Sequence, residues 1–494
     1  MLKQSDDHIL LGADHMGAGV ELPLKMCNRH GLIAGATGTG KTVSVQIMAE
    51  HFSAAGVPVF VSDVKGDLAG LAAEGGDKDF LHARAEKIGL QGYTGKSFPV
   101  RLWDFYGEGG LPIRATVTEV GPLLMSRMLD LNDTQEGVLA ITFRVADEDG
   151  LPLLDLKDLR ALLAHVSERR AELSAMYGNV SPSSVAAIQR RLIQLEDQGG
   201  ELFFGEPALD VRDLLRTTRD GQGIINVLKA DKLMMAPRLY GAFLLWLLSE
   251  LFEELPEVGD PEKPKLVFVF DEAHLLFDGA SKSLLDKVEQ VCRLIRSKGV
   301  GVFFATQDPG DIPDDVAGQL GSKIQHALRA FTPAQQKRVK AAADGFRPNP
   351  AFDTREVITE LGVGEALVST LQKKGIPTPV SRMLIRPPAS RLGPLTDKER
   401  KAILRDDELS SIYAKPVDNR SAHEMLAERA ERMAREAEKA ETKTVREKRQ
   451  RSTKRRRSSR MTTTERAINQ AARTASGTLV RELIRGLLGG LKRR

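Results

Sequence analysis

The chain lacks the features that mark secreted, membrane-spanning and metal-clustered proteins. It has two cysteines in 494 residues, Cys27 and Cys292, which are too few for a disulfide framework or a cysteine-based metal cluster. No apolar run reaches the length needed to span a bilayer, even at 239–251, where Arg238 and Glu250 bracket the segment. The polar, acidic first eight residues are unlike a secretory signal. These absences predict a cytoplasmic protein with no transmembrane segment.

Charge of one sign is scarce except in the C-terminal tail. The net charge is only +4, and 41% hydrophobic with 28% charged residues is ordinary for a soluble globular chain. Residues 443–460, however, hold ten Lys or Arg residues against one acidic residue, Glu447. The basic excess is therefore local. The length allows two or three domains.

The most informative segment, residues 35–42, reads Gly-Ala-Thr-Gly-Thr-Gly-Lys-Thr. It lies between an apolar run at 31–34 and a helix-like stretch at 43–49, which is the order that a phosphate-binding loop requires. Lys41 would reach the β- and γ-phosphates of ATP, and the Thr42 hydroxyl would complete a Mg²⁺ shell. The predicted nucleotide-binding residues are Gly35, Ala36, Thr37, Gly38, Thr39, Gly40, Lys41, Thr42 and Val43.

A second motif, at residues 265–272, predicts hydrolysis as well as binding. Five apolar residues followed by Asp271 and Glu272 describe a buried strand that ends at the phosphate site. Asp271 would hold the Mg²⁺ hydration shell, and Glu272 would act as the general base for the attacking water.

Other polar residues are predicted near the same site. Gln307 ends the next strand, where it can sense the γ-phosphate. Asp63 ends an earlier strand and either supports the metal or water, or caps a turn. A transition-state arginine is also needed, and Arg296, Arg329 and Arg338 are the candidates, with Arg296 acting on a neighbouring subunit.

Alternating strands and helices predict an α/β fold with a mostly parallel central sheet. A helical insertion interrupts the alternation, with helices expected at 121–131, 134–145, 155–177 and 181–198. The predicted divisions are a β-structured lead-in at 1–30, an α/β core at 31–117 and 222–395, the helical insertion at 118–221, and a tail at 396–494.

The tail is expected to begin as a linker. Its composition then predicts a charged helix at 421–450, a basic run that is disordered when unbound, and an amphipathic segment at 479–488. The amphipathic segment could dock on its own protein, on a partner subunit or on a membrane surface, and the basic run suits contacts with the phosphates of nucleic acid.

The motifs at 35–42, 270–274 and 305–309 together resemble the HerA–FtsK superfamily of hexameric P-loop motor ATPases. Further stretches at 62–68, 230–234, 293–299 and 325–333 make the chain most similar to the bacterial YjgR-type HerA-like helicase family, over residues 5–395. The resemblance implies a RecA-like fold, a hexameric ring and ATP at subunit interfaces. It also implies the roles given above to Lys41, Thr42, Asp271, Glu272 and Gln307, and it makes Arg296 the leading trans-acting residue.

The sequence suggests three candidate functions. The first is a ring-forming ATPase that moves double-stranded DNA, as a translocase or helicase. The second is an ATP-driven assembly or regulatory scaffold whose protein partner binds the tail. The third, a small-molecule kinase, is disfavoured by the long gap between Lys41 and Asp271 and by the sensor-like Gln307.

Overall fold

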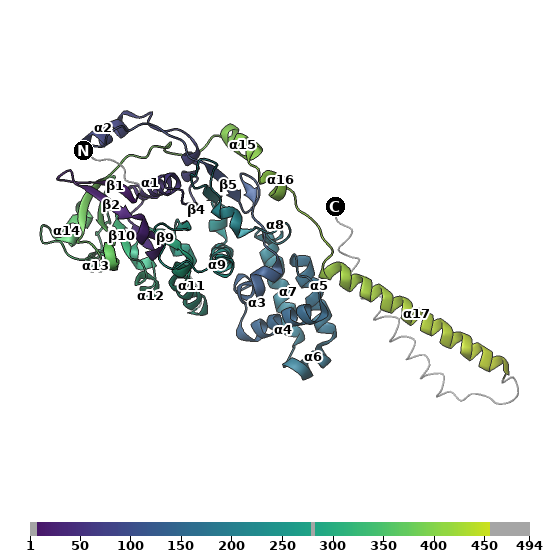
Figure 1. Cartoon of the computed structure of the whole chain (residues 1–494). Helices are drawn as coiled ribbons and strands as arrows, with labels where there is room; N and C mark the ends of the chain where they lie inside the picture. The colour runs from purple at the N-terminus through teal and green to yellow at the C-terminus, as the bar shows by residue number, and fades with distance from the viewer. Residues whose placement is uncertain (1–6, 278–281, 455–494) are drawn as a thin grey trace.

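The computed structural model describes residues 7–277 and 282–454, and its centre is one twelve-stranded sheet (Figure 1). The strands lie in the order β2-β1-β12-β11-β10-β3-β9-β8-β4-β7-β5-β6. Their bounds are β1 (His8–Asp14), β2 (Gly19–Pro23), β3 (Gly31–Ala34), β4 (Val59–Asp63), β5 (Val100–Asp104), β6 (Leu111–Pro112), β7 (Ile225–Lys229), β8 (Leu266–Phe270), β9 (Val300–Thr306), β10 (Ser322–Gln325), β11 (Glu365–Ser369) and β12 (Ser381–Ile385).

The sheet has a parallel part and an antiparallel extension. From β10 to β6 all neighbours are parallel. At the other end β11, β12, β1 and β2 pair antiparallel. The predicted α/β class with a mostly parallel sheet is confirmed. The predicted lead-in supplies β1 and β2, which join this same sheet through β12 instead of forming a unit of their own.

Helices cover both faces of the parallel strands, and this explains why central strands such as β3 and β8 are apolar throughout. In β8, Val267 and Val269 pack in the cluster that contains α1 (Lys41–Ala54), whereas Phe268 and Phe270 pack in the cluster that contains α9 (Pro237–Glu254). The other helices of the core are η1 (Leu24–Arg29), η2 (Leu68–Ala72), α2 (Asp79–Lys87), η4 (Leu233–Met235), α10 (His274–Phe277), α11 (Lys282–Ile295), η5 (Arg296–Lys298), η6 (Pro309–Asp311), α12 (Asp314–Ala317), α13 (Pro333–Asp344), α14 (Thr354–Glu360) and η7 (Lys373–Gly375).

The helical insertion comprises α3 (Val117–Met128), α4 (Asp133–Asp149), α5 (Leu156–Glu168), α6 (Arg170–Tyr177), α7 (Pro182–Asp197), α8 (Gly200–Phe203) and η3 (Val211–Leu215). The single helix expected at 155–177 was wrong, because the backbone leaves the helical region at Arg169 (ψ 9°) and divides it into α5 and α6. The first helix has two parts: the capping box of Thr116 and Glu119 starts a short turn at Val117, and the backbone then leaves the helical region at Gly121 (φ 70°, ψ 170°). The longer part begins at Pro122, one residue after the expected start.

The segment expected as a linker is folded onto the body as α15 (Asp397–Asp406) and α16 (Ser410–Tyr413). Arg101 donates to Asp407 at 2.8 Å and fixes this segment to β5. The predicted charged helix is α17 (Ala422–Lys454), which starts against α5, where the His423 amide donates to Asp158 at 2.8 Å, and then extends away from the body (Figure 1).

The end of the predicted basic run and the amphipathic segment at 479–488 lie outside the described residues. Within the part of the chain that the structure describes, no helix is both long enough and apolar enough to cross a membrane.

Candidate nucleotide site

Four adjacent strands bring the predicted site residues to one edge of the sheet. The strands β3, β9, β8 and β4 are parallel neighbours in that order. Their carboxyl ends carry the loop at 35–42, Gln307, Asp271 with Glu272, and Asp63 respectively. This edge is where ligands bind in open α/β sheets.

The glycine loop has the backbone of an anion cradle. Gly35, Gly38 and Gly40 have φ values of 153°, 79° and 117°, which other residues rarely adopt. A Cβ at Gly35 would also lie 2.5 Å from the Cβ of His326, so a side chain does not fit there. No side chain caps the start of α1, so its first amides are directed to a ligand. These features fit a bound phosphate chain.

Lys41 is buried at the base of this loop and bonds to the loop itself. Its Nζ donates to the carbonyl oxygens of Gly35 and Ala36. Burial lowers the pKa of Lys41, while the nearby charges of Glu272 and Asp271 oppose that change. The Lys41 ammonium can exchange these neutral carbonyl oxygens for phosphate oxygens, because charged phosphate oxygens are stronger hydrogen-bond acceptors.

The side-chain oxygens of the site suit a Mg²⁺ ion that would bind together with a nucleotide. In residues 7–277 and 282–454 no group of three His, Cys, Asp or Glu residues could hold a metal alone. Mg²⁺ usually takes one or two carboxylates with phosphate oxygens and water, and Asp271 with the Thr42 hydroxyl offers that minimum. Burial, with the Glu272 charge, raises the pKa of Asp271 to about 6. A bound cation would favour its charged form.

Glu272 is held in a strained and enclosed position. Its φ is 51°, in the left-handed region that side chains disfavour, and its side chain is 3% exposed. Gln307 Nε2 donates to its carboxylate at 3.2 Å, and Lys65 Nζ lies 3.2 Å from Oε1. The two residues expected at neighbouring strand ends, Glu272 and Gln307, are therefore in direct contact.

Asp63 is positioned as a turn-capping residue. Its carboxylate accepts the backbone amides of Gly66, Leu68 and Ala69 at 2.8, 2.9 and 3.2 Å. Burial, together with the Asp271 charge, raises its pKa to about 6. Of the two alternatives left open by the sequence, this geometry favours the cap over the support of metal or water.

The three candidate arginines lie in different places. Arg296 precedes β9 and pairs with Asp260 at 3.2 Å, so a whole strand separates it from Gln307. Arg338 pairs with Asp308, the residue after Gln307, at 2.8 Å. Arg329 is exposed beyond the end of β10.

Sequence reasoning missed several residues that support the site. His326 is fully buried beneath the loop, where its Nδ1 donates to the Glu365 carbonyl at 3.0 Å and its Nε2 accepts from the Ser44 hydroxyl at 2.9 Å. Burial lowers its pKa to about 4, so the ring is neutral. The signal was present, since His326 and Lys65 lie in the stretches 325–333 and 62–68 that carry the family resemblance.

A second support comes from the turn before β11. The Gly364 amide donates to the Thr39 carbonyl at 3.0 Å, and Arg84 of α2 donates to the Gly364 carbonyl at 2.9 Å. The phosphate loop is therefore held by a segment that is distant in the sequence, the turn before β11.

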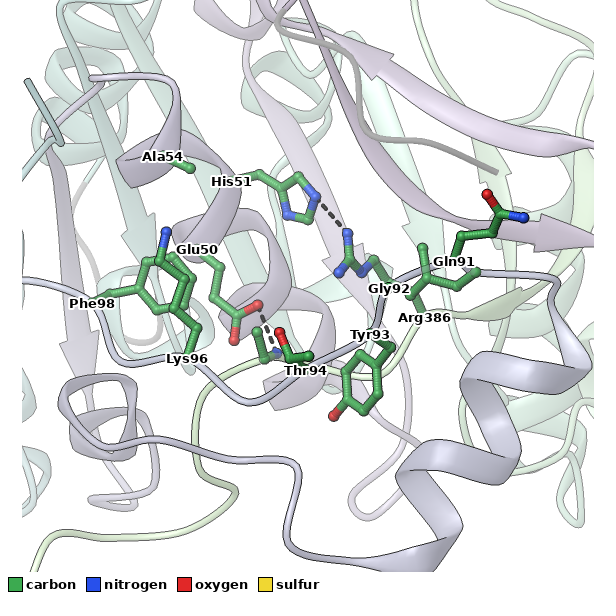
Figure 2. Close-up of a pocket in the computed structure, with 12 residues that line it drawn as sticks. Glu50, His51, Ala54, Gln91, Gly92, Tyr93, Thr94, Lys96, Phe98 and Arg386 are labelled. Atoms are coloured by element: carbon green, nitrogen blue, oxygen red, sulfur yellow. Dashed lines mark hydrogen bonds between the residues drawn. The ribbon is translucent and has the colours of Figure 1, made fainter. Parts of the chain in front are cut away.

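The opposite end of α1 borders a separate pocket of about 230 Å³ (Figure 2). Arg386 donates to His51 Nε2 at 2.7 Å, and the Ala389 amide donates to Glu50 at 3.0 Å. These buried polar groups satisfy one another, and their contacts fix the segment after β12 onto α1.

Solved structures share this fold. The bacterial conjugative coupling protein TrwBdeltaN70, in its unbound form, has a TM-score of 0.50 and 16% identity, covering 79% of this chain and 92% of its own. The plasmid coupling protein TrwB in complex with ADP and Mg²⁺ has a TM-score of 0.50 and 15% identity, covering 79% and 92%. VirB4 of Thermoanaerobacter pseudethanolicus has a TM-score of 0.51 and 16% identity, covering 77% and 97%. At these identities the likeness establishes the RecA-like fold.

Among curated proteins, none matches the chain. The model of the family described as helicase HerA-like C-terminal matches residues 8–494. With its phosphate loop and acidic strand end assembled at one edge of the sheet, the chain is a P-loop ATPase that uses ATP and Mg²⁺, and it belongs to this HerA-like family.

Proposed function

We propose that the protein is a ring-forming motor of the cytoplasm that hydrolyses ATP to move along double-stranded DNA. The observation that carries the proposal is the contact between Glu272 and Gln307 beside the phosphate loop, in a chain of a helicase-like family. The coupling protein TrwB and VirB4, which share the fold, lend support. The motor core is assigned to 31–117 and 222–395, with the helical insertion at 118–221 and the tail at 396–494 as appended units.

Each residue of the site has a separate role in hydrolysis. The loop amides and Lys41 bind the phosphates, and Thr42 with Asp271 would hold Mg²⁺, which neutralises charge on the β- and γ-oxygens. Glu272 takes the proton of the attacking water as general base. Gln307, in contact with Glu272, senses the loss of the γ-phosphate and passes it to the loop at 308–315.

The positions of the arginines support the proposal of a ring. Within the described ranges, no arginine forms an ion pair with Asp271 or Glu272, whereas Lys65 does. Transition-state charge on the γ-phosphate is commonly neutralised by an arginine from another subunit. We assign this role to Arg296, which cannot reach its own site, in a closed hexamer.

ATPase assays on the full chain test the DNA part of the proposal. Phosphate release is measured at 50 and 200 mM salt, with duplex DNA, with single-stranded DNA and without DNA, and Lys41→Ala serves as the inactive control. We expect duplex DNA to stimulate hydrolysis, and the stimulation to weaken at the higher salt as counterion release predicts. A rate that duplex DNA leaves unchanged, together with no salt-sensitive binding, would exclude DNA as the substrate.

One observation favours the second function, an ATP-driven scaffold for a protein partner. Beyond its contact with α5, α17 presents an exposed helix with Met433 and Val445 on its surface, exposed by 70% and 52%. A chain that ends at Lys415 lacks this helix and serves as the comparison in affinity capture. If it retains every partner of the full chain, the scaffold reading is wrong.

A further inference from the structure

Glu272, the proposed general base, already has protein partners at its carboxylate. Lys65 Nζ lies 3.2 Å from its Oε1, and Gln307 Nε2 donates to the same carboxylate at 3.2 and 3.4 Å. With a side chain only 3% exposed, Glu272 has these protein groups around it in place of solvent, and His274 Nδ1 lies 3.4 Å from its Oε2. An oxygen that accepts from an ammonium is a poor acceptor for a water proton, so one of these contacts must change before hydrolysis.

The side chain of Lys65 can change position while its backbone stays fixed. It lies in the turn after β4, where Asp63 accepts the amides of Gly66, Leu68 and Ala69. Its side chain is 38% exposed, which leaves the four-carbon stem room to turn. Burial lowers the pKa of Lys65, but the hydrogen bond and charge of Glu272 raise it above its ordinary value overall, so the group stays cationic.

Lys65 also lies close to where a γ-phosphate would bind. Its charge and that of Lys41, the phosphate-binding lysine, are near enough to influence each other. The γ-phosphate of ATP would add negative charge beside both lysines, whereas ADP would not. A γ-phosphate there would give the ammonium of Lys65 a second acceptor beside Glu272.

From this geometry we propose that Lys65 is a positioning residue that holds the Glu272 carboxylate while the γ-phosphate is absent and moves to the γ-phosphate when ATP binds. The move frees an oxygen of Glu272 for the attacking water. This role rests on the proposed ATP hydrolysis by Glu272, and it adds a device that links the base to the presence of ATP.

The test compares Lys65→Met, which keeps the stem but removes the charge, with Lys65→Arg, which restores it. Lys229→Met is the matched control, because Lys229 lies opposite Asp63 on the neighbouring strand and forms ion pairs with Asp104 and Asp231 instead of Glu272. Calorimetry measures the Kd of ADP and of a non-hydrolysable ATP analogue, both with Mg²⁺, and phosphate release gives kcat.

We expect Lys65→Met to bind ADP as the unchanged chain does, and to lose about tenfold in affinity for the ATP analogue, because only the latter gains the charge-assisted contact. Its kcat should fall, Lys65→Arg should recover most of both, and Lys229→Met should change neither. An equal loss of ADP and analogue affinity, or a preserved ratio, would overturn the proposal.

A double-mutant cycle with Glu272→Gln asks whether the two residues act together. Glu272→Gln removes the competing negative charge, so it should tighten binding of the analogue, and about fivefold of that gain should vanish in the Lys65→Met background. Additive effects would show that Lys65 acts independently of Glu272. Failure of the unchanged chain to hydrolyse ATP would refute the proposed function and this role together, whereas normal hydrolysis with an unchanged affinity ratio would refute the role alone.

Discussion

Mixing two inactive variants should restore hydrolysis if Arg296 acts on a neighbouring subunit. In the folded chain Arg296 precedes β9 and Gln307 follows it, and the seven residues of that strand span about 20 Å. Arg296 therefore cannot serve its own Glu272. In a ring of Glu272→Gln and Arg296→Ala subunits, an interface is competent when the first partner supplies Glu272 and the second supplies Arg296.

Random assembly of equal amounts makes about one quarter of the interfaces competent, because two independent choices of one half are multiplied. Each variant alone has none. We therefore expect phosphate release at about one quarter of the unmodified rate per site after mixing, and almost none before it. Folding should be little affected, since the Arg296–Asp260 pair is partly exposed and such pairs contribute about 0–1 kcal/mol.

Mixtures of Glu272→Gln with Arg338→Ala are the comparison, because Arg338 pairs with Asp308 beside the Gln307 of its own chain, so mixing should not restore any activity that Arg338→Ala loses. Unmixed Arg296→Ala that hydrolyses ATP normally would remove Arg296 from the mechanism. An inactive Arg296→Ala that mixing does not rescue would show that it acts within its own chain or on folding.

Three further outcomes are expected. Glu272→Gln should retain nucleotide binding while hydrolysis falls about 10²–10⁴-fold, the usual contribution of a general base, and single-turnover rates within tenfold of normal would refute its role. Asp63→Ala should lower the free energy of unfolding in urea by about 2–5 kcal/mol, because the buried Leu68 and Ala69 amides lose their acceptor. The same substitution should leave the Mg²⁺ dependence of ATP binding unchanged. If that dependence is lost, Asp63 is a metal-site residue instead. Burial, with the Arg386 charge, lowers the pKa of His51 to about 3, so its contribution to stability is present above the unfolded pKa and is lost as pH falls below it. The stability advantage over His51→Gln should therefore shrink by about 2 kcal/mol between pH 7 and pH 5, and a constant difference would contradict the neutral ring.

Much of the site could be predicted because its chemistry lies in short contiguous motifs. The loop at 35–42 carries its own geometry in its glycines, and an apolar run that ends in Asp271 and Glu272 can only be a buried strand reaching a polar edge. Parallel strands place their carboxyl ends together, so Gln307 could be assigned to the same edge before its contact with Glu272 was known.

The elements that the sequence did not predict are those that form only by pairing with segments distant in the sequence. β10 (Ser322–Gln325) has one strongly apolar residue, Ile324, and is a strand because it pairs with β3 and β11. Without β10, His326 had no predicted position beneath the loop. The contact of Lys65 with Glu272 similarly requires that β4 lie beside β8, and residue spacing does not determine strand order.

The position of β3 between β9 and β10 has a consequence for biosynthesis. The phosphate loop leaves the ribosome early, but the strands on both sides of β3 and the turn at Gly364 that binds Thr39 follow hundreds of residues later. Until then β3 has unpaired edges, at which other strands can add. The nascent chain thus cannot use ATP to guide its own folding, and nucleotide binding is acquired only when synthesis of the core is nearly complete.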